Sequence, residues 1–300
     1  QPFDWHWVPS VGHSGIILMG CNHDVCDVLS WDIGVFFLAA TIKHRALGHS
    51  WVIVCIYRPA DHARSADFLL ELTNLVGTKR AINLPVLVGG GFNLIHSGAD
   101  KNNANIDSTR VSMFNNAIAA ATLREAARTG ARYTWTNKQM QPVRSVLDRV
   151  FFTPEWEALF PMCTLVAETR IGSDHVPLIF SSGEDFIRRS PRFYFKTDWF
   201  EAEGFAQMVV DRWGAICTQL GPQRGPAERW NAAAGKLRAF LRGWGANHGS
   251  ESKKACARIV ETTGLLDAET DRRPFSEAEW AHRYALENQV TAILRVEEEY

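Results

Sequence analysis

Short apolar runs broken by turn residues dominate residues 1–182 of the chain. Runs bounded by Gly, Pro and polar residues predict buried strands, whereas apolar residues three or four positions apart predict helices. Strands are expected at residues 15–19, 34–41, 51–57, 85–88, 133–136, 145–152 and 176–180, and helices at residues 67–77 and 109–120. The strand at 85–88 is expected to stop where three glycines follow. Strands that alternate with helices predict a layered α/β architecture.

The pattern changes in the second part of the chain. A polar and basic stretch at residues 183–197 is followed by apolar stripes at helical spacing in residues 226–244 and 276–296. Ser276, with Glu279 three positions later, is typical of a capping box at the start of a helix. We therefore predict an α/β domain at residues 1–182, a connector at residues 183–197 and a helical segment at residues 198–300.

Composition narrows the function classes only slightly. The 32 basic and 33 acidic residues give a net charge of −1, without the basic excess typical of nucleic-acid-binding proteins. A metal-dependent phosphodiesterase remains compatible, because its clustered acids offset basic residues in such a sum. The six cysteines show no metal-binding spacing and predict reduced thiols in an intracellular protein. We expect neither a signal peptide nor a transmembrane segment.

Two polar segments are candidates for catalytic chemistry. Asp174 and His175 precede an apolar strand and would offer a metal-binding carboxylate beside a general base, although for this pair taken alone a turn-capping Asp and a surface His are the favoured explanation. Asp148 interrupts an apolar strand, where a carboxylate is costly unless it is bonded. It could orient a catalytic His or form a structural ion pair with Arg149.

Three further segments carry weaker signals. Asn93 follows the glycines at a strand end, where α/β proteins build their sites, but the segment could be a simple turn. Tyr57 ends its strand and could contact a phosphate or merely pack. Trp135 and Asn137 could contact DNA by stacking and hydrogen bonding, while core packing is the competing explanation for Trp135.

Together and in this order, these segments resemble motifs of the endonuclease/exonuclease/phosphatase superfamily. Residues 14–18 resemble its "SGGIL" strand, 57–59 "VYGP", 90–93 "GDFN", 133–137 "FTWSN", 147–152 "LDRVFV" and 173–177 "SDHxP". Residues 92–103 and the Gly-Trp-Gly-Ala-Asn sequence at 243–247 are similar to plant LINE (non-LTR) retrotransposon polyproteins. In those polyproteins the helical segment lies between the endonuclease and a reverse transcriptase.

The resemblance implies two packed mixed β-sheets flanked by helices and a nuclear enzyme that nicks DNA with Mg²⁺ or Mn²⁺. Carried onto this sequence, Asp174 would bind the metal, and His175, Asp148, Asn93 and Tyr57 would be catalytic. Asn137, Trp135 and Arg58 would contact the substrate, although Arg58 could instead crowd the phosphate pocket. Oxygen ligands and charge on a phosphoryl group suit a hard divalent ion.

The sequence departs from the family pattern at the site itself. Gly91 stands where the family has an Asp, and Arg58 replaces a Gly. The strand with the family's Asn and the one ending in its metal-binding Glu would lie upstream, so a truncated copy is expected. We therefore expect an endonuclease-like protein with impaired catalysis. The alternative is a non-catalytic remnant that binds nucleic acid weakly.

Overall fold

The computed structural model describes residues 3–9, 15–183, 193, 195, 197–220, 225–247 and 250–298. It consists of two compact units. The first contains Gln1–Asp185 and Gly264–His282, and the second contains Phe186–Thr263 and Arg283–Tyr300. Most of the predicted connector and Ser14 lie outside the described residues. The sequence prediction placed all of residues 198–300 in a separate helical segment, whereas the structure groups Gly264–His282 with the α/β unit.

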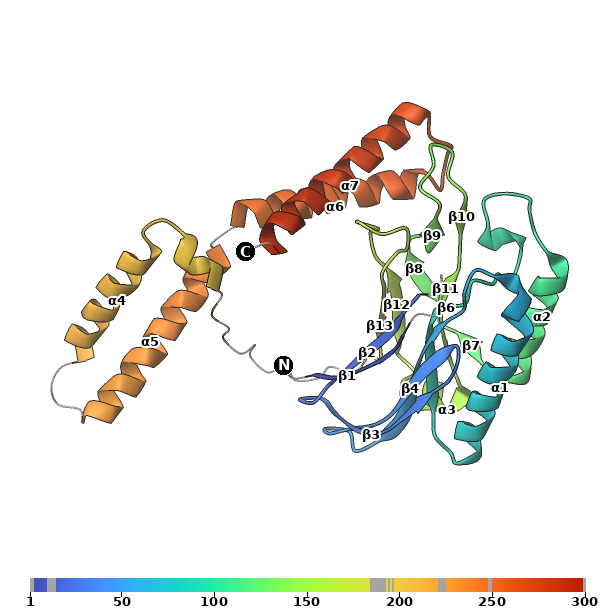
Figure 1. The fold of residues 1–300 in the computed structure, drawn as a ribbon, viewed down its shortest axis with the longest axis horizontal. Coiled ribbons are helices and arrows are strands. Elements are labelled where there is room, and N and C mark those ends of the chain that lie inside the picture. Colours follow the sequence, from blue (N-terminus) through green and yellow to red (C-terminus); the bar gives the residue numbers. More distant parts are fainter. Residues whose placement is uncertain are drawn as a thin grey trace. The chain divides into compact units, whose positions relative to one another are not determined.

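A six-stranded mixed sheet forms the centre of the first unit, in the order β3-β4-β5-β6-β11-β7 (Figure 1). Its strands are β3 (Cys26–Ile33), β4 (Phe37–His44), β5 (Ser50–Tyr57), β6 (Val86–Gly91), β11 (Asp148–Phe152) and β7 (Arg124–Glu125). All neighbours are antiparallel except β5 and β6, which are parallel. Helix α1 (Ser65–Ala81) makes the crossover that a parallel pair requires.

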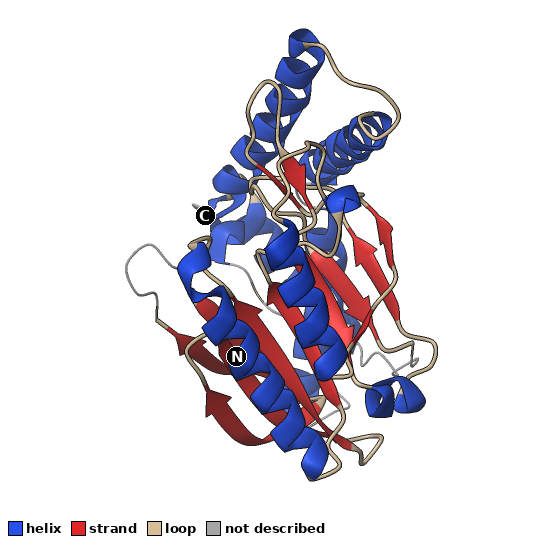
Figure 2. Cartoon of the chain, turned by 90° about the vertical axis from the view of Figure 1, so that its right-hand side faces the viewer, coloured by secondary structure: helices blue, strands red, loops and turns tan. Residues whose placement is uncertain are grey.

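Helices α1 and α2 (Ser108–Ala120) cover one face of this sheet (Figure 2). The core beneath them is aromatic: Phe68 is 1% exposed, and Phe92, Phe114 and Phe151 are fully buried. The Phe92 ring lies 4.9 Å from Phe151 and 5.6 Å from Phe114 between ring centroids. Both predicted helices are confirmed, and their apolar stripes pack against this face of the sheet.

The opposite face of the sheet packs against a second layer of shorter strands. This layer contains a ribbon of β1 (Phe3–Val8) and β2 (Ile17–Asn22), and a sheet of β13 (Leu178–Ser181), β12 (Thr164–Ala167) and β8 (Arg128–Gly130). Met19, Trp51, Trp156 and Leu165 are buried in this second core. Trp156 belongs to the short helix α3 (Pro154–Leu159). The predicted architecture of two packed mixed layers flanked by helices is therefore confirmed.

Strand β6 does not stop at the glycines but continues through all of them, which corrects the sequence prediction. Gly90 lies opposite Ile56 on one side and Arg149 on the other. It has φ +140°, and a Cβ there would lie 2.1 Å from the Ile56 carbonyl oxygen. Only glycine permits this approach, so Gly90 extends the strand by allowing two backbones to meet.

Four long helices complete the chain: α4 (Phe205–Leu220), α5 (Pro226–Asn247), α6 (Ser250–Glu269) and α7 (Glu277–Glu298). The stripes predicted at 226–244 and 276–296 correspond to α5 and α7. The predicted capping box forms, since Ser276 N–H donates to Glu279 Oε2 over 2.8 Å and Glu279 N–H donates to Ser276 Oγ over 3.4 Å. Among the described residues, none of the helices combines the length and apolar character needed to cross a membrane.

Neighbouring glycines in β6 should respond oppositely to the same substitution. Gly90→Ala should lower the free energy of unfolding by at least about 2 kcal/mol. The alanine would have to adopt a positive φ, and its Cβ would clash with the backbone of Ile56. Gly91→Ala should be neutral or slightly stabilising, since its Cβ would meet nothing nearer than 3.5 Å. Urea unfolding of both variants checks this, and equal destabilisation would contradict the described backbone.

Candidate active site

Three adjacent strands present one residue each at the same level of the sheet. Tyr57 at the end of β5 lies opposite Gly91 of β6, and Gly91 lies opposite Asp148 of β11. A Cβ added to Gly91 would lie 3.5 Å from Asp148 Oδ1 and 3.6 Å from Tyr57 Cδ2. The Tyr57 ring also packs against Gly15, whose Cβ would come within 3.0 Å of it. Tyr57 and Asp148 therefore flank one open position at a strand end.

Asp148 and His175 form the central polar pair of the site. Asp148 Oδ2 lies 2.7 Å from His175 Nδ1, and the side chains are 16% and 39% exposed. The hydrogen bond to Asp148 is the main cause that raises the pKa of His175, opposed by partial burial and helped by the charge of Asp174. Asp148 thus fixes the ring orientation and favours the imidazolium, leaving Nε2 for a ligand.

Thr134, which sequence reasoning missed, joins the segments that carry this pair. Its side chain is fully buried, and Oγ1 accepts hydrogen bonds from the backbone N–H groups of Leu147 and Asp148, each over 2.9 Å. Its carbonyl oxygen accepts from Val176 N–H over 2.7 Å. Because Val176 follows His175, Thr134 sets the distance between the two members of the pair. No local sequence signal marks such a role.

Asp174 is held by the neighbouring hairpin of β9 (Trp135–Thr136) and β10 (Arg144–Ser145). Trp135 Nε1–H donates to Asp174 Oδ2 over 3.0 Å, and Thr136 N–H donates to the Asp174 carbonyl oxygen over 3.0 Å. Trp135 also forms a bridge with His175. The indole therefore orients the carboxylate beside the His175–Asp148 pair rather than filling a core.

Asn137 lies in the turn of this hairpin and has a structural contact. Its Oδ1 accepts from Val143 N–H over 3.0 Å, and its own N–H donates to the Val143 carbonyl oxygen over 3.1 Å. These bonds close the loop between the two short strands. The contact of Asn137 with DNA stays a prediction.

Arg58 and Asn93 form a buried unit beside the site. Arg58 is fully buried, and its five N–H groups bond to the carbonyl oxygens of Phe92 (2.9 Å), Asp61 (2.9 Å) and Asn93 (2.6 Å), to Ser65 Oγ (3.1 Å) and to His62 Nδ1 (3.2 Å). Burial lowers the pKa of Arg58 to about 10, which leaves it charged at neutral pH. Every donor is engaged within the protein. Arg58 therefore holds the loop after β6, and its contact with substrate stays a prediction.

The unit is reciprocal, because Asn93 Nδ2–H donates to the Arg58 carbonyl oxygen. Asn93 adopts a left-handed backbone with φ +50° directly after β6. Its side chain is thus directed at the end of β5 through a backbone bond. The structure places it near Tyr57 and Gly91, while a contact with phosphate or metal stays a prediction.

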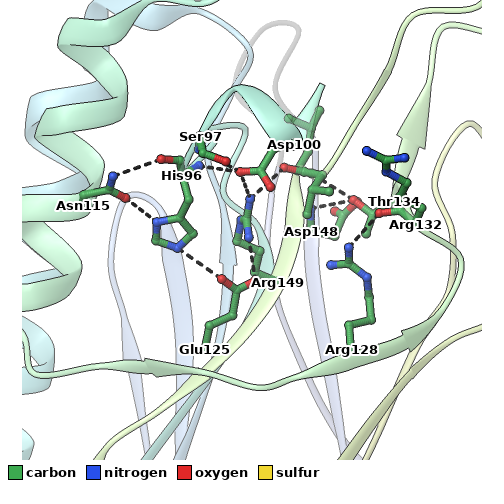
Figure 3. A network of polar contacts seen from close by, with 12 residues as sticks. His96, Ser97, Asp100, Asn115, Glu125, Arg128, Arg132, Thr134, Asp148 and Arg149 are labelled. Atoms are coloured by element: carbon green, nitrogen blue, oxygen red, sulfur yellow. Dashed lines mark hydrogen bonds and ion pairs between the residues drawn. The ribbon is translucent and has the colours of Figure 1, made fainter. Parts of the chain in front are cut away.

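Arg149 has ion-pair partners of its own within the polar network shown in Figure 3, which also includes Thr134 and Asp148. It is 3% exposed and forms ion pairs with Glu125 (2.5 Å) and Asp100 (2.6 Å). His96 Nε2 lies 3.3 Å from Glu125 Oε2, which extends the network towards α2. The sequence left open whether Asp148 pairs with His175 or with Arg149, and the observed partner is His175.

Comparison with known proteins gives one family match. A model described as the endonuclease/exonuclease/phosphatase family matches residues 6–175, which is more than half of the chain and includes Asp148 and His175. None of the curated proteins compared with the chain matches it in sequence.

Several solved structures are similar to this chain, and the names of some describe an endonuclease or a phosphatase. The endonuclease domain of TRAS1, a telomere-specific non-LTR retrotransposon, has a TM-score of 0.50 at 15% identity and covers 62% of this chain and 82% of that chain. The 3′ phosphatase NExo from Neisseria, bound to a product DNA hairpin, has a TM-score of 0.46 at 18% identity, covering 58% and 77%. The human Nocturnin catalytic domain has a TM-score of 0.40 at 14% identity, covering 60% and 73%. The likeness to the TRAS1 domain, at 15% identity, shows the fold alone.

The Asp148–His175 pair predicts a pH dependence that can be measured directly. The pKa of His175 should lie above the ordinary value of about 6.5, and Asp148→Asn should lower it. The interaction should stabilise the fold fully below pH about 6.5 and be lost as pH rises through the raised pKa. NMR titration of the imidazole checks this, with exposed His23 as control. A His175 pKa unchanged by Asp148→Asn would contradict the assigned hydrogen bond.

Thr134 should be more sensitive to loss of its hydroxyl than to loss of its methyl group. Thr134→Val keeps the shape but leaves two amide donors without their acceptor, which should cost about 1–3 kcal/mol for each that stays unsatisfied. Thr134→Ser should retain both bonds. Chemical unfolding and the His175 titration should therefore separate the two variants, with only Thr134→Val moving the His175 pKa towards its ordinary value. Equal behaviour of Val and Ser would refute the role given to the hydroxyl.

Proposed function

Since this chain belongs to the endonuclease/exonuclease/phosphatase family, we propose that it is a DNA-directed phosphodiesterase domain of LINE-retrotransposon descent whose catalysis is impaired. The family match supports the reaction class. The sequence motifs and the fold shared with a retrotransposon endonuclease support the descent. The plant lineage, a nuclear location and a reverse transcriptase downstream belong to the same proposal and rest on motif similarity at residues 92–103 and 243–247.

The observation that carries the proposal is the Asp148–His175 pair at 2.7 Å beside a carboxylate held by an indole. A His with a raised pKa keeps a proton on Nε2 to higher pH than a free imidazole does. That proton can be donated to a phosphate oxygen, either to bind it or to stabilise its developing charge. Asp148 orients the ring and stabilises the imidazolium during the exchange.

Impairment follows from Gly91. The family pattern has a carboxylate at this position, between Tyr57 and Asp148, where an added Cβ would make ordinary van der Waals contacts. Raising the pKa of His175 favours its protonated form, which cannot accept a proton from water, and Gly91 has no side chain that could take that role. The proposal is therefore phosphate recognition by His175 combined with slow proton abstraction.

The resemblance also implies a divalent metal, and the described residues do not fit one well. They contain no group of three or more His, Cys, Asp or Glu side chains placed to hold a metal ion. Of the nearby carboxylates, Asp148 is bonded to His175 and Asp174 to Trp135. No catalytic step is therefore assigned here to Mg²⁺ or Mn²⁺. Asp174 stays the metal ligand that the motif predicts.

The second candidate is a nucleic-acid-binding module without catalysis. The same His175 would then serve as an anion contact only. The two candidates separate on one point, which is whether a carboxylate restored at position 91 produces strand cleavage.

Gly91→Asp should raise plasmid nicking from near background by about 10²-fold, the usual contribution of one electrostatic group in an active site. A Cβ added at Gly91 would make only ordinary van der Waals contacts, so the variant should fold. Gly91→Asn is the isosteric control and should give no gain. The assay compares both with the parent chain and with His175→Ala, in Mg²⁺ and in Mn²⁺, alongside DNA binding measured by fluorescence anisotropy.

Each result decides between the candidates. Robust nicking by the parent chain that disappears in His175→Ala would show that catalysis is intact and the impairment wrong. DNA binding by the parent that weakens in His175→Ala, with no nicking by Gly91→Asp, would favour the binding module. Neither binding nor nicking by any variant would overturn both.

A further inference from the structure

The turn that joins α6 and α7 belongs to the α/β unit, although the sequence pattern assigned it to a separate segment. We call Gly264–His282 the helical tip. It packs closely on the domain, since a Cβ added to Gly264 would lie 2.7 Å from Thr169 Oγ1. Trp280 is 7% exposed. The tip is thus an integral part of the unit that contains the candidate active site (Figure 1).

One side chain of the β9–β10 hairpin makes several polar contacts with the helical tip. Arg144 Nη2–H donates to the Thr270 carbonyl oxygen over 3.1 Å, and Nη1–H donates to Asp271 Oδ1 over 3.3 Å and to Thr270 Oγ1. Its guanidinium also lies over the rings of Tyr133 (4.9 Å) and Trp280 (5.9 Å). A planar cation that is 18% exposed and bonded on several sides is held in one orientation.

A cavity beside Arg144 makes its hydrogen bonds important for holding the tip against the domain. A cavity of about 410 Å³ separates parts of the tip from the domain, lined among others by Tyr133, Trp135, Arg144 and Trp280. Close packing alone therefore does not fix the hairpin against the tip along this boundary. The directional bonds of Arg144 supply the constraint that packing leaves out.

The hairpin transmits this constraint to the site. Arg144 lies opposite Thr136 in the β9–β10 register, and Ser145 lies opposite Trp135. Thr136 N–H and Trp135 Nε1–H both bond to Asp174. A shift of β10 would therefore move the indole donor that holds the Asp174 carboxylate and the amide donor that holds its backbone carbonyl.

We infer that Arg144 is a positioning residue, which ties the β9–β10 hairpin to the helical tip and thereby fixes Trp135 on the Asp174 carboxylate. The functional meaning of this role rests on the proposed function, because Asp174 is taken as a member of that site. The tie itself is a property of the fold. It makes a segment far along the sequence a determinant of active-site geometry.

Hydrogen exchange in the full chain tests the inference from both sides of the contact. Arg144→Gln removes the guanidinium, and Asp271→Asn alters the tip without touching the hairpin. Each should speed exchange of the Trp135 indole N–H and the Thr136 amide by about tenfold, as expected for loss of a charge-assisted bond. Arg144→Lys, which keeps the charge but not the planar fork, should give an intermediate effect. Arg45→Gln, which removes an exposed pair with Asp27, is the matched control and should change neither site.

The amide of Val54, buried in the central sheet, reports global unfolding. Unchanged exchange at Trp135 and Thr136 in both variants would overturn the inference, as would equal acceleration at Val54. Non-additive effects in the Arg144→Gln/Asp271→Asn double variant would confirm that the two side chains act through one contact. Exchange needs no catalysis. Selective acceleration without any nicking by Gly91→Asp would therefore uphold the positioning and contradict the catalytic role proposed for the site.

Discussion

The backbone register of β6 between its two neighbours is the constraint on which the site depends. The parallel pairing with β5 and the antiparallel pairing with β11 put Tyr57, Gly91 and Asp148 at one level. That register requires the backbones of β5 and β6 to meet at Gly90, where a side chain has no room. A slip by one residue would turn Asp148 to the opposite face of the sheet. The chemistry at the strand ends thus depends on a residue that takes no part in it.

Charged side chains in apolar surroundings show how the same physical requirement gives different outcomes. A buried charge must find partners, and the sequence cannot say which. Arg58 satisfies the requirement with backbone carbonyls and Arg149 with two carboxylates, so both stabilise the fold around the site. Asp148 satisfies it with a half-exposed His, so its partner stays accessible to a ligand. The difference lies in what surrounds each partner and not in the residue types.

The sequence predicted much of the fold because its central elements are well buried, β4 on both faces and α1 and α2 on one face. The runs that became β4, β5 and β6, and the stripes of α1 and α2, are of this kind. It missed β1 and β3, which leave many apolar side chains exposed: Trp5 is 45% and Trp7 59% exposed, so these rings do not fill a core as their size suggested. It also ended β6 too early, because a glycine run looks like a turn unless the neighbouring backbones are known.

For the site, short motifs identified Asp148, Asp174 and His175, and the structure brings these together. The sequence could not show that the Trp135 indole holds Asp174, because that bond joins segments 39 positions apart. Thr134 and Arg144 were missed for the same reason. Each acts through bonds to groups that lie far away in the chain, and no periodicity or spacing records such a bond. Tertiary contacts decide which polar residues support a site.

The backbone at Gly91 has room for a Cβ, so the residue at this position affects the chemistry proposed for the site more than it affects the fold. Codons for aspartate and glycine differ by one base, so a single mutation can remove a carboxylate here, and the space around it gives no reason for a cavity or a clash to follow. Cellular quality control acts on unfolded chains and does not sense lost chemistry. A chain with glycine at position 91 would therefore be degraded no faster than one with aspartate there, so this position can change without a penalty on the fold.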